Sequence, residues 1–133
     1  MSLKSKFDAV YKRKVEDNLD KTVRATALAV MSNIVIATPV DTGRARNNWN
    51  ADINAVDAST TKEANPNANG IGKVTDALAR YKKGATVFIS NNLPYIRRLN
   101  EGHSKQAPAN FVDKAVMIGK RQGKEIAKRD FNK

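Results

Sequence analysis

The chain has 133 residues, which is enough for one domain (residues 1–133) with a single modest core. It contains no cysteine, which excludes a disulfide framework and thiolate metal sites. No apolar run approaches the roughly 20 residues of a membrane span, and Met1-Ser2-Leu3 leads directly into charged residues without the apolar segment of a signal peptide. We therefore expect a soluble protein of the cytoplasm that makes no contact with a membrane.

The chain is strongly basic, because its 24 lysine and arginine residues outnumber 13 acidic residues and give a net charge of +11. Such a balance favours acidic partners, including nucleic acid, and predicts salt-sensitive association. The positive charge is spread over both terminal segments and the middle, with no single Lys/Arg-rich tract. A solvated basic surface is the simpler interpretation, and a nucleic-acid partner is the alternative.

A long amphipathic helix is predicted from about Ser5 to Ala37. Its apolar residues recur at steps of three or four, which places them on one helical face. They are Phe7, Tyr11, Val15, Leu19, Val23, Ala27, Val30 and Ile34. Pro39 lacks a backbone N–H and disfavours helical geometry at Thr38, so the helix should end near Ala37. A helix of about 33 residues would be roughly 50 Å long, longer than a domain of this size needs, which indicates assembly.

A turn and a strand are predicted after this helix. Asp41-Thr42-Gly43 is typical of a turn in which the glycine takes positive φ. From Asn48 to Val56 apolar and polar residues alternate, which predicts a strand with one buried face and a row of Asn and Asp on the other. Trp49, the only tryptophan, is the expected anchor of this strand on the core.

The middle of the chain combines a loop, two short helical segments and a second strand. Residues 57–72 are rich in Ala, Ser, Thr, Asn and Gly, which predicts a flexible loop that becomes ordered on assembly. A short helix is expected from about Val74 to Tyr81, and a strand from Ala85 to Ser90. Tyr95 to Leu99 fits one helical turn.

A last helix is expected to begin near Asn110, a favourable N-cap residue. Gly119 and Gly123 lower helix propensity; they either permit close packing against another helix or weaken the C-terminal end. The elements together predict an α+β fold, with the long N-terminal helix and the C-terminal helix packed on a small, mostly antiparallel sheet. The apolar stripe of the last helix is predicted to comprise Phe111, Ala115, Ile118, Gln122 and Ile126.

No group of residues forms a convincing catalytic or metal site. His103 is the only histidine, and its neighbours Glu101 and Ser104 do not make a triad, because catalytic groups converge through the fold rather than along the sequence. Asp41 and Glu101 are either paired carboxylates or, more simply, a turn cap and the partner of a nearby arginine. Residues 70–73, Gly-Ile-Gly-Lys, lack the spacing of a phosphate-binding loop. We therefore expect no enzyme, no cofactor and no bound metal.

Four arginines are the strongest candidates for contacts with other molecules. Arg44 and Arg46 follow the predicted turn, and Arg97 and Arg98 follow Tyr95 closely. Arginine binds carboxylate or phosphate with two parallel hydrogen bonds and is enriched in interfaces. An aromatic ring beside two arginines suits base stacking or a protein interface. The alternative is an exposed basic turn with Tyr95 packed into the core.

Two segments of the chain carry the pattern of a known family. Residues 38–49 are Thr-Pro-Val-Asp-Thr-Gly-Arg-Ala-Arg-Asn-Asn-Trp, and residues 90–96, Ser-Asn-Asn-Leu-Pro-Tyr-Ile, are followed by Glu101 and Gly102. They resemble the signatures T-P-V-D-T-G-x-L-x-x-S/N-W and N-x-x-P-Y-A-x-x-x-E-x-G of tail-component proteins of tailed bacteriophages. Ala45 stands where this family often has a larger apolar residue, and Ile96 stands where it has a small one.

The resemblance implies a small α+β protein of the minor tail protein Z or neck-protein type, which completes the tail or joins it to the head. We therefore expect a non-enzymatic virion protein, made in the host cytoplasm, that forms a homo-oligomeric ring near DNA and contacts other tail or head-completion proteins. A basic nucleic-acid-binding module that uses Arg97, Arg98 and the C-terminal lysines is the alternative function. The candidate interface residues are Arg44, Arg46, Trp49, Tyr95, Arg97, Arg98 and Glu101.

Overall fold

The computed structural model describes residues 2–40, 43–102 and 109–131, without the side chains of residues 7, 11, 130 and 131. The predicted turn at Asp41 and Thr42 and the loop around His103 lie outside these residues. The predicted α+β class is confirmed. The elements are α1 (Leu3–Ala37), α2 (Arg44–Asn47), β1 (Trp49–Ile53), α3 (Ile71–Leu78), β2 (Val87–Asn91), α4 (Ile96–Asn100) and α5 (Phe111–Phe131).

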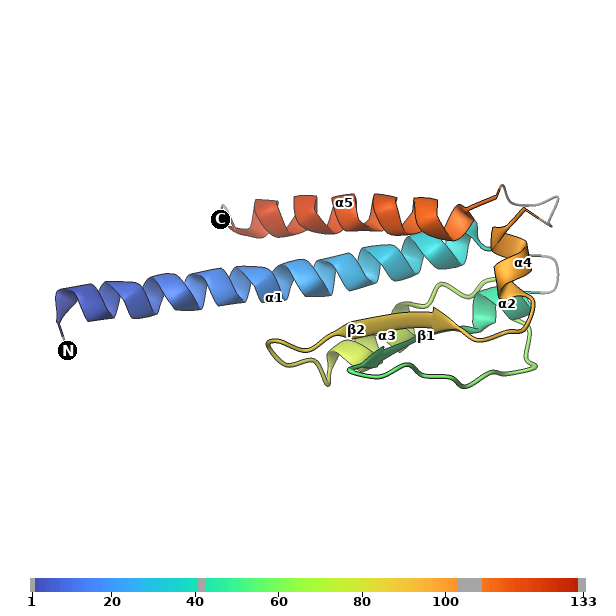
Figure 1. The fold of residues 1–133 in the computed structure, drawn as a ribbon, viewed down its shortest axis with the longest axis horizontal. Coiled ribbons are helices and arrows are strands. Elements are labelled where there is room, and N and C mark those ends of the chain that lie inside the picture. Colours follow the sequence, from blue (N-terminus) through green and yellow to red (C-terminus); the bar gives the residue numbers. More distant parts are fainter. Residues whose placement is uncertain (1, 41–42, 103–108, 132–133) are drawn as a thin grey trace.

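The two long helices, α1 and α5, run antiparallel, and α1 lies between α5 and the sheet (Figure 1). The sheet consists of β1 and β2, which pair antiparallel with Trp49 opposite Asn91 and Ile53 opposite Val87. The connection between the strands contains α3, which packs against β1 and α1. The helices and the sheet therefore enclose one core.

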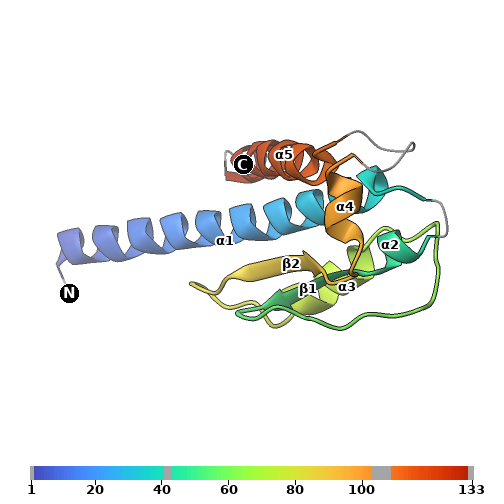
Figure 2. The ribbon, with the colours of Figure 1, turned by 45° about the vertical axis from the view of Figure 1, so that its right-hand side comes forward.

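The C-terminal half of α1 supplies much of this core, whereas its N-terminal half extends beyond it. Leu3 is 85% exposed, and Val10 and Leu19 are each 60% exposed. Figures 1 and 2 show this half projecting past the other elements. The excess length that the sequence predicted is therefore real. The buried residues in the C-terminal half are Ala27, Val30, Met31, Ile34 and Val35.

The end of α1 anchors β1 on the core. Thr38 has an extended backbone, as a residue before proline should, and the helix ends at Ala37 as predicted. The Thr38 hydroxyl donates to Ile34 O at 2.6 Å and accepts from Trp49 Nε1 at 2.9 Å. Trp49 is buried, so its predicted role as the anchor of the strand is confirmed.

The contact between α1 and α5 depends on the absence of side chains at two positions. A Cβ atom on Gly119 would lie 2.6 Å from Val30 Cα, and one on Gly123 would lie 2.5 Å from Thr26 Cα. These distances are too short for real contacts, so only glycine lets the two backbones approach this closely. Close packing is therefore the correct choice between the two interpretations of these glycines.

The buried row of α5 differs from the predicted stripe. Gln122 is exposed and Ile126 is 36% exposed, so the prediction is wrong for both residues. The stripe was predicted from the helical spacing alone, but where α5 lies this close to α1 the buried positions are mainly glycine and alanine. The buried row consists of Phe111, Ala115, Gly119, Gly123 and Ala127.

Several element boundaries differ from the prediction by a few residues. β1 ends at Ile53 because Asn54 has a φ of 61° and begins a turn. α3 begins at Ile71, inside the predicted loop, and α2 was not predicted at all. Gly43 has a φ of 76°, which confirms the positive φ expected there.

The start of α5 is also capped differently from the prediction. α5 begins directly after Asn110, as expected, but Asn110 has a φ of 64° rather than the extended backbone of an ordinary N-cap. The N–H of Val112 bonds to Asn100 Oδ1 at 2.9 Å. The last residue of α4 therefore caps α5.

Candidate functional site

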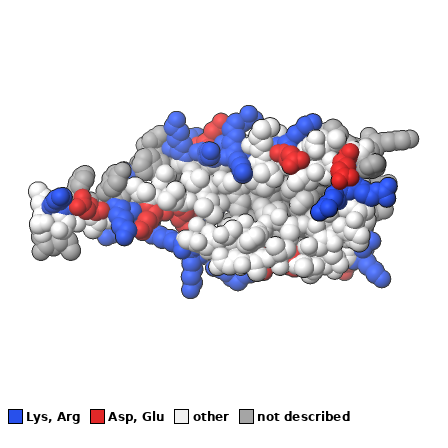
Figure 3. All heavy atoms as spheres, viewed as in Figure 1, with Lys and Arg blue, Asp and Glu red and all other residues white. Residues whose placement is uncertain are grey.

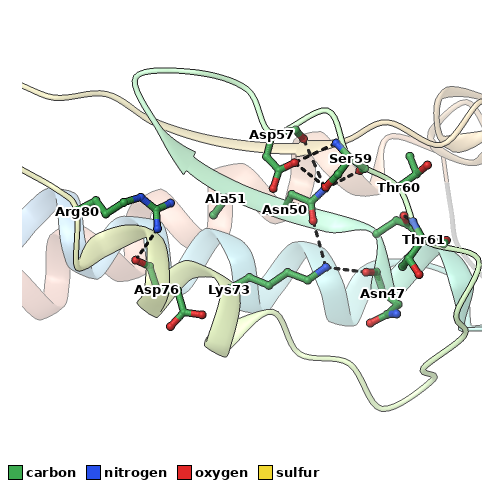
Figure 4. Close-up of a pocket in the computed structure, with 11 residues that line it drawn as sticks. Asn47, Asn50, Ala51, Asp57, Ser59, Thr60, Thr61, Lys73, Asp76 and Arg80 are labelled. Carbon is green, nitrogen blue, oxygen red and sulfur yellow. Dashed lines mark hydrogen bonds between the residues drawn. The ribbon is translucent and has the colours of Figure 1, made fainter.

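A polar hollow of about 410 Å³ lies between β1, α3 and the segment that follows β1 (Figure 4). Asparagine amides, serine and threonine hydroxyls, two aspartates and the cations Lys73 and Arg80 line it. Polar groups that converge in a hollow are candidates for ligand binding. The hydrogen bonds of these groups therefore decide what the hollow can do.

Lys73 crosses from α3 to the edge of β1. Its Nζ donates to Asn47 O at 2.7 Å, to Trp49 O at 2.9 Å and to Asn50 Oδ1 at 3.2 Å. An ammonium group has three donors, so all of them are used. Burial lowers the pKa of Lys73, and the Asp57 carboxylate opposes this shift. Lys73 thus fastens α3 to β1 and keeps no donor for a phosphate.

Two asparagines fasten the segment after β1 onto the polar face of that strand. Asn48 Nδ2 donates to Thr61 O at 3.0 Å, and Asn48 Oδ1 accepts from the Thr61 N–H at 2.8 Å. Asn50 Nδ2 donates to Ser59 O at 2.9 Å. Both asparagines are buried, so the prediction that the polar residues lie on an uncovered face is wrong at these two positions, whereas Asp52 is only partly buried and Asn54 is exposed. Backbone groups rather than apolar side chains cover Asn48 and Asn50.

Asp57, which lines the hollow, and Asp52, which is bonded to the lining residue Arg80, both accept hydrogen bonds that favour the ionised carboxylate. Asp57 Oδ1 accepts from the Ser59 hydroxyl at 2.6 Å and from the Ser59 N–H at 3.0 Å, which lowers the pKa of Asp57 below its ordinary value of 3.8. Asp52 accepts from the Ile53 N–H at 2.8 Å and from Arg80 at 2.9 Å, and these bonds lower its pKa as well. A carboxylate with a lowered pKa is poorly suited to general acid–base catalysis near neutral pH.

The hollow is therefore a structural feature, since its polar groups hold β1, α3 and the following segment together. Across residues 2–40, 43–102 and 109–131, no group of three or more His, Asp or Glu side chains could hold a metal ion. The segment that follows β1 has neither helix nor strand, but the hydrogen bonds of Asn48 and Asn50 hold its backbone in place. Whether this segment becomes ordered only on assembly stays a prediction.

Arg46, a predicted interface residue, holds the C-terminal end of α1. Its guanidinium group donates to Ile36 O at 2.7 Å, to Thr38 O at 2.9 Å and to Pro66 O at 3.2 Å. A cation that binds the last carbonyls of a helix satisfies unpaired acceptors and is favourable at the negative end of the helix. Arg46 thus also joins α1 to the segment before α3.

The remaining candidate interface residues lie in different settings. Trp49 is 4% exposed and belongs to the core. Arg44 is partly buried, donates to Thr61 O at 3.4 Å and lies over the ring of Tyr95, 6.0 Å from its centroid. The structure thus pairs Arg44 with Tyr95 across two segments. The exposed members are Arg97, Arg98 and Glu101, on α4 or directly after it.

A second hollow, of about 450 Å³, lies between α1, β2 and α5 and is mainly apolar. We call it the β2 groove. Lys120 of α5 is among its few charged or polar lining residues. An open apolar hollow in contact with three elements is a candidate docking surface. Its apolar lining comprises Val23, Ala27, Val30, Ala85, Val87, Ile89 and Val116.

The strand that borders this groove is the open edge of the sheet. Hydrogen-bonded and non-hydrogen-bonded pairs alternate along an antiparallel ladder. The bond from Asn54 N to Thr86 O, at 2.8 Å, sets this alternation, so Val87 and Ile89 direct their backbone N–H and C=O groups away from β1. Among the described residues these groups have no hydrogen-bond partner. The edge of β1, by contrast, is covered by α3 and Lys73.

The projecting half of α1 is a second unpartnered apolar surface. Leu3 and Val10 are seven residues apart, so they lie on the same helical face, and both are mostly exposed. No described helix is both long and apolar enough to cross a membrane.

One ion-paired contact marks where the projecting half leaves the body. Lys83, in the turn before β2, lies 3.3 Å from Asp17 and 3.5 Å from Glu16. The two carboxylates raise the pKa of Lys83, with Asp17 the stronger influence. This contact lies near the middle of α1, and the part of the helix on its N-terminal side projects past the other elements (Figure 1).

Comparisons of the chain with protein-family models, with curated proteins and with solved structures give no match. Function is therefore inferred from the surfaces of this chain. The sequence prediction missed the β2 groove because its lining comes from three distant segments. The alternation at residues 85–90 was the only signal of that surface.

Proposed function

We propose that this protein is a structural virion assembly protein that completes a phage tail or joins it to the head, and that it acts as an oligomeric ring. The observation that carries this proposal is the presence of two unpartnered apolar surfaces on one chain, the projecting half of α1 and the β2 groove. The resemblance of residues 38–49 and 90–102 to tail-component proteins supports the same function. The structural use of the polar hollow supports a non-enzymatic role.

The occupant proposed for the β2 groove is α1 of a second copy. An amphipathic helix that lays apolar residues into a groove is a common mode of recognition. Because the helix and the groove are different surfaces, each copy would give its helix to one neighbour and its groove to another. Such a head-to-tail contact closes into a ring when the rotation between copies permits it. The outer faces of the ring would then contact other tail or head-completion proteins.

The mass of the native protein in solution tests this proposal. We expect the wild-type chain to form a closed oligomer and the double variant Leu3→Glu/Val10→Glu to be monomeric. Both side chains are exposed, so the variant should keep the fold and the thermal stability of the single chain. Met117→Glu, at a residue of α5 that is 67% exposed, is the control and should keep the wild-type mass.

Two results would contradict the proposal. One is a wild-type chain that remains monomeric at every concentration up to the solubility limit. The other is a double variant whose mass equals that of the wild type, since this would show that the projecting helix takes no part in the contact.

A further inference from the structure

We propose that the solvent-facing side of α5 binds the phosphate backbone of duplex nucleic acid. Figure 3 shows several Lys and Arg side chains along the upper side of the molecule, where α5 lies, with fewer Asp and Glu side chains among them. We call this surface the α5 basic face. Its members, all exposed, are Lys114, Lys120, Arg121, Lys124, Lys128 and Arg129.

The spacing of these cations places them on one side of the helix. Lys114, Arg121 and Lys128 recur every seven residues and so lie on one face. The buried row, which includes Gly119 and Gly123, faces α1 on the other side. From Lys114 to the last cation the helix rises about 22 Å, over which a duplex presents about thirteen phosphate charges. Several phosphates are therefore within reach at once.

Among the described residues, no ion pair joins these cations to a carboxylate, although Asp113 and Glu125 are also exposed on α5. The described ion pairs join α1 with itself, β1 with residue 80, and α1 with the turn before β2, and none of them involves α5. Lys120, Lys124 and Lys128 also repel one another, because like charges four residues apart face each other on a helix. A polyanion bound along this face would relieve that repulsion and release its own counterions.

The chemistry of the face favours nucleic acid over a protein or a membrane. Lysine is depleted in protein–protein interfaces, whereas four of these six residues are lysine. Binding to a membrane surface requires an apolar face free to enter the lipid. The apolar face of α5 is already packed on α1. Sequence-independent phosphate binding requires only cations within reach of the backbone.

Matched charge variants test this inference. The test variant is Lys114→Gln/Lys124→Gln/Lys128→Gln, and none of these lysines lines the β2 groove, so a failure of assembly and a failure of duplex binding are distinguishable. The control variant removes the same charge from other exposed positions, and it is Lys21→Gln/Lys62→Gln/Lys82→Gln. Binding of a fluorescein-labelled duplex of mixed sequence is measured by anisotropy across a salt series.

We expect the test variant to bind the duplex at least about tenfold more weakly, with a log–log salt slope smaller by about 2.7 for three lost phosphate contacts. The control should stay within about twofold of the wild type. Equal losses in both variants would overturn the inference, since net charge alone would then explain binding. A wild-type chain without duplex binding at low salt would also overturn it. So would polyglutamate that competes as well as the duplex at equal charge, because the partner would then be an acidic protein.

Discussion

At the scale of single residues, the fold depends on positions where a side chain is absent or fully engaged. Gly123 lets α5 approach α1, and Lys73 gives all three of its donors to β1 and to the carbonyl of Asn47. Neither role follows from residue type alone. A glycine in a helix normally lowers stability, and a lysine near glycines suggests a phosphate site. In both cases the partner that decides the role is distant in the sequence.

Replacing Gly123 with alanine should lower the free energy of unfolding by about 1–2 kcal/mol. The new Cβ would overlap Thr26, and the cost of this overlap should exceed the gain in helix propensity. Gly72→Ala is the matched control, since a Cβ there meets nothing within 4 Å, and it should raise stability by about 0.5–1 kcal/mol. Urea unfolding measures both. A Gly123→Ala variant as stable as Gly72→Ala would show that the helices do not pack this closely.

At the scale of elements, the strongest predictions came from local signals. Pro39 set the end of α1, and the alternation around Trp49 located β1 and its anchor. The stripe of α5 was misplaced because the closeness of α1 is a tertiary property. The covered polar face of β1 was missed because Asn48 and Asn50 bond to backbone groups 9 to 13 residues away.

The role of Arg46 is a further tertiary property, and it gives a prediction about the end of α1. Arg46→Ala should lower the free energy of unfolding by about 2 kcal/mol, because it leaves the carbonyls of Ile36 and Thr38 without their charged donor. Arg97→Ala, on the exposed surface of α4, is the control and should change it by less than about 0.5 kcal/mol. Thermal unfolding monitored by circular dichroism measures both. Equal changes in stability in the two variants would mean that the hydrogen bonds from Arg46 do not stabilise the end of α1.

At the scale of the whole molecule, the structure combines a small closed core with surfaces that a single copy leaves open. The core, the capped helix ends and the bonded hollow make one stable unit. The projecting half of α1, the β2 groove and the α5 basic face lie on the outside of this unit. Sequence periodicity indicated the long helix and its excess length. The groove could not be predicted, because it exists only once α1, β2 and α5 are packed together.

The central claim is a head-to-tail contact between copies. It predicts that two variants, each lacking one of the two contact surfaces, form a single contact with each other when they are mixed. Leu3→Glu/Val10→Glu removes the helix surface, and Val87→Lys places a charge in the β2 groove. Phe88→Lys, on the opposite face of β2, is the control for the second variant and should keep the wild-type oligomer.

The most direct measurement is native mass spectrometry of the two defective variants, each alone and then mixed in equal amounts. Each variant alone should be monomeric. The mixture should contain a heterodimer and nothing larger, because the intact helix of one variant can enter only the intact groove of the other. A mixture that stays monomeric, while the wild type forms an oligomer and both variants remain folded, would contradict a contact between α1 and the β2 groove.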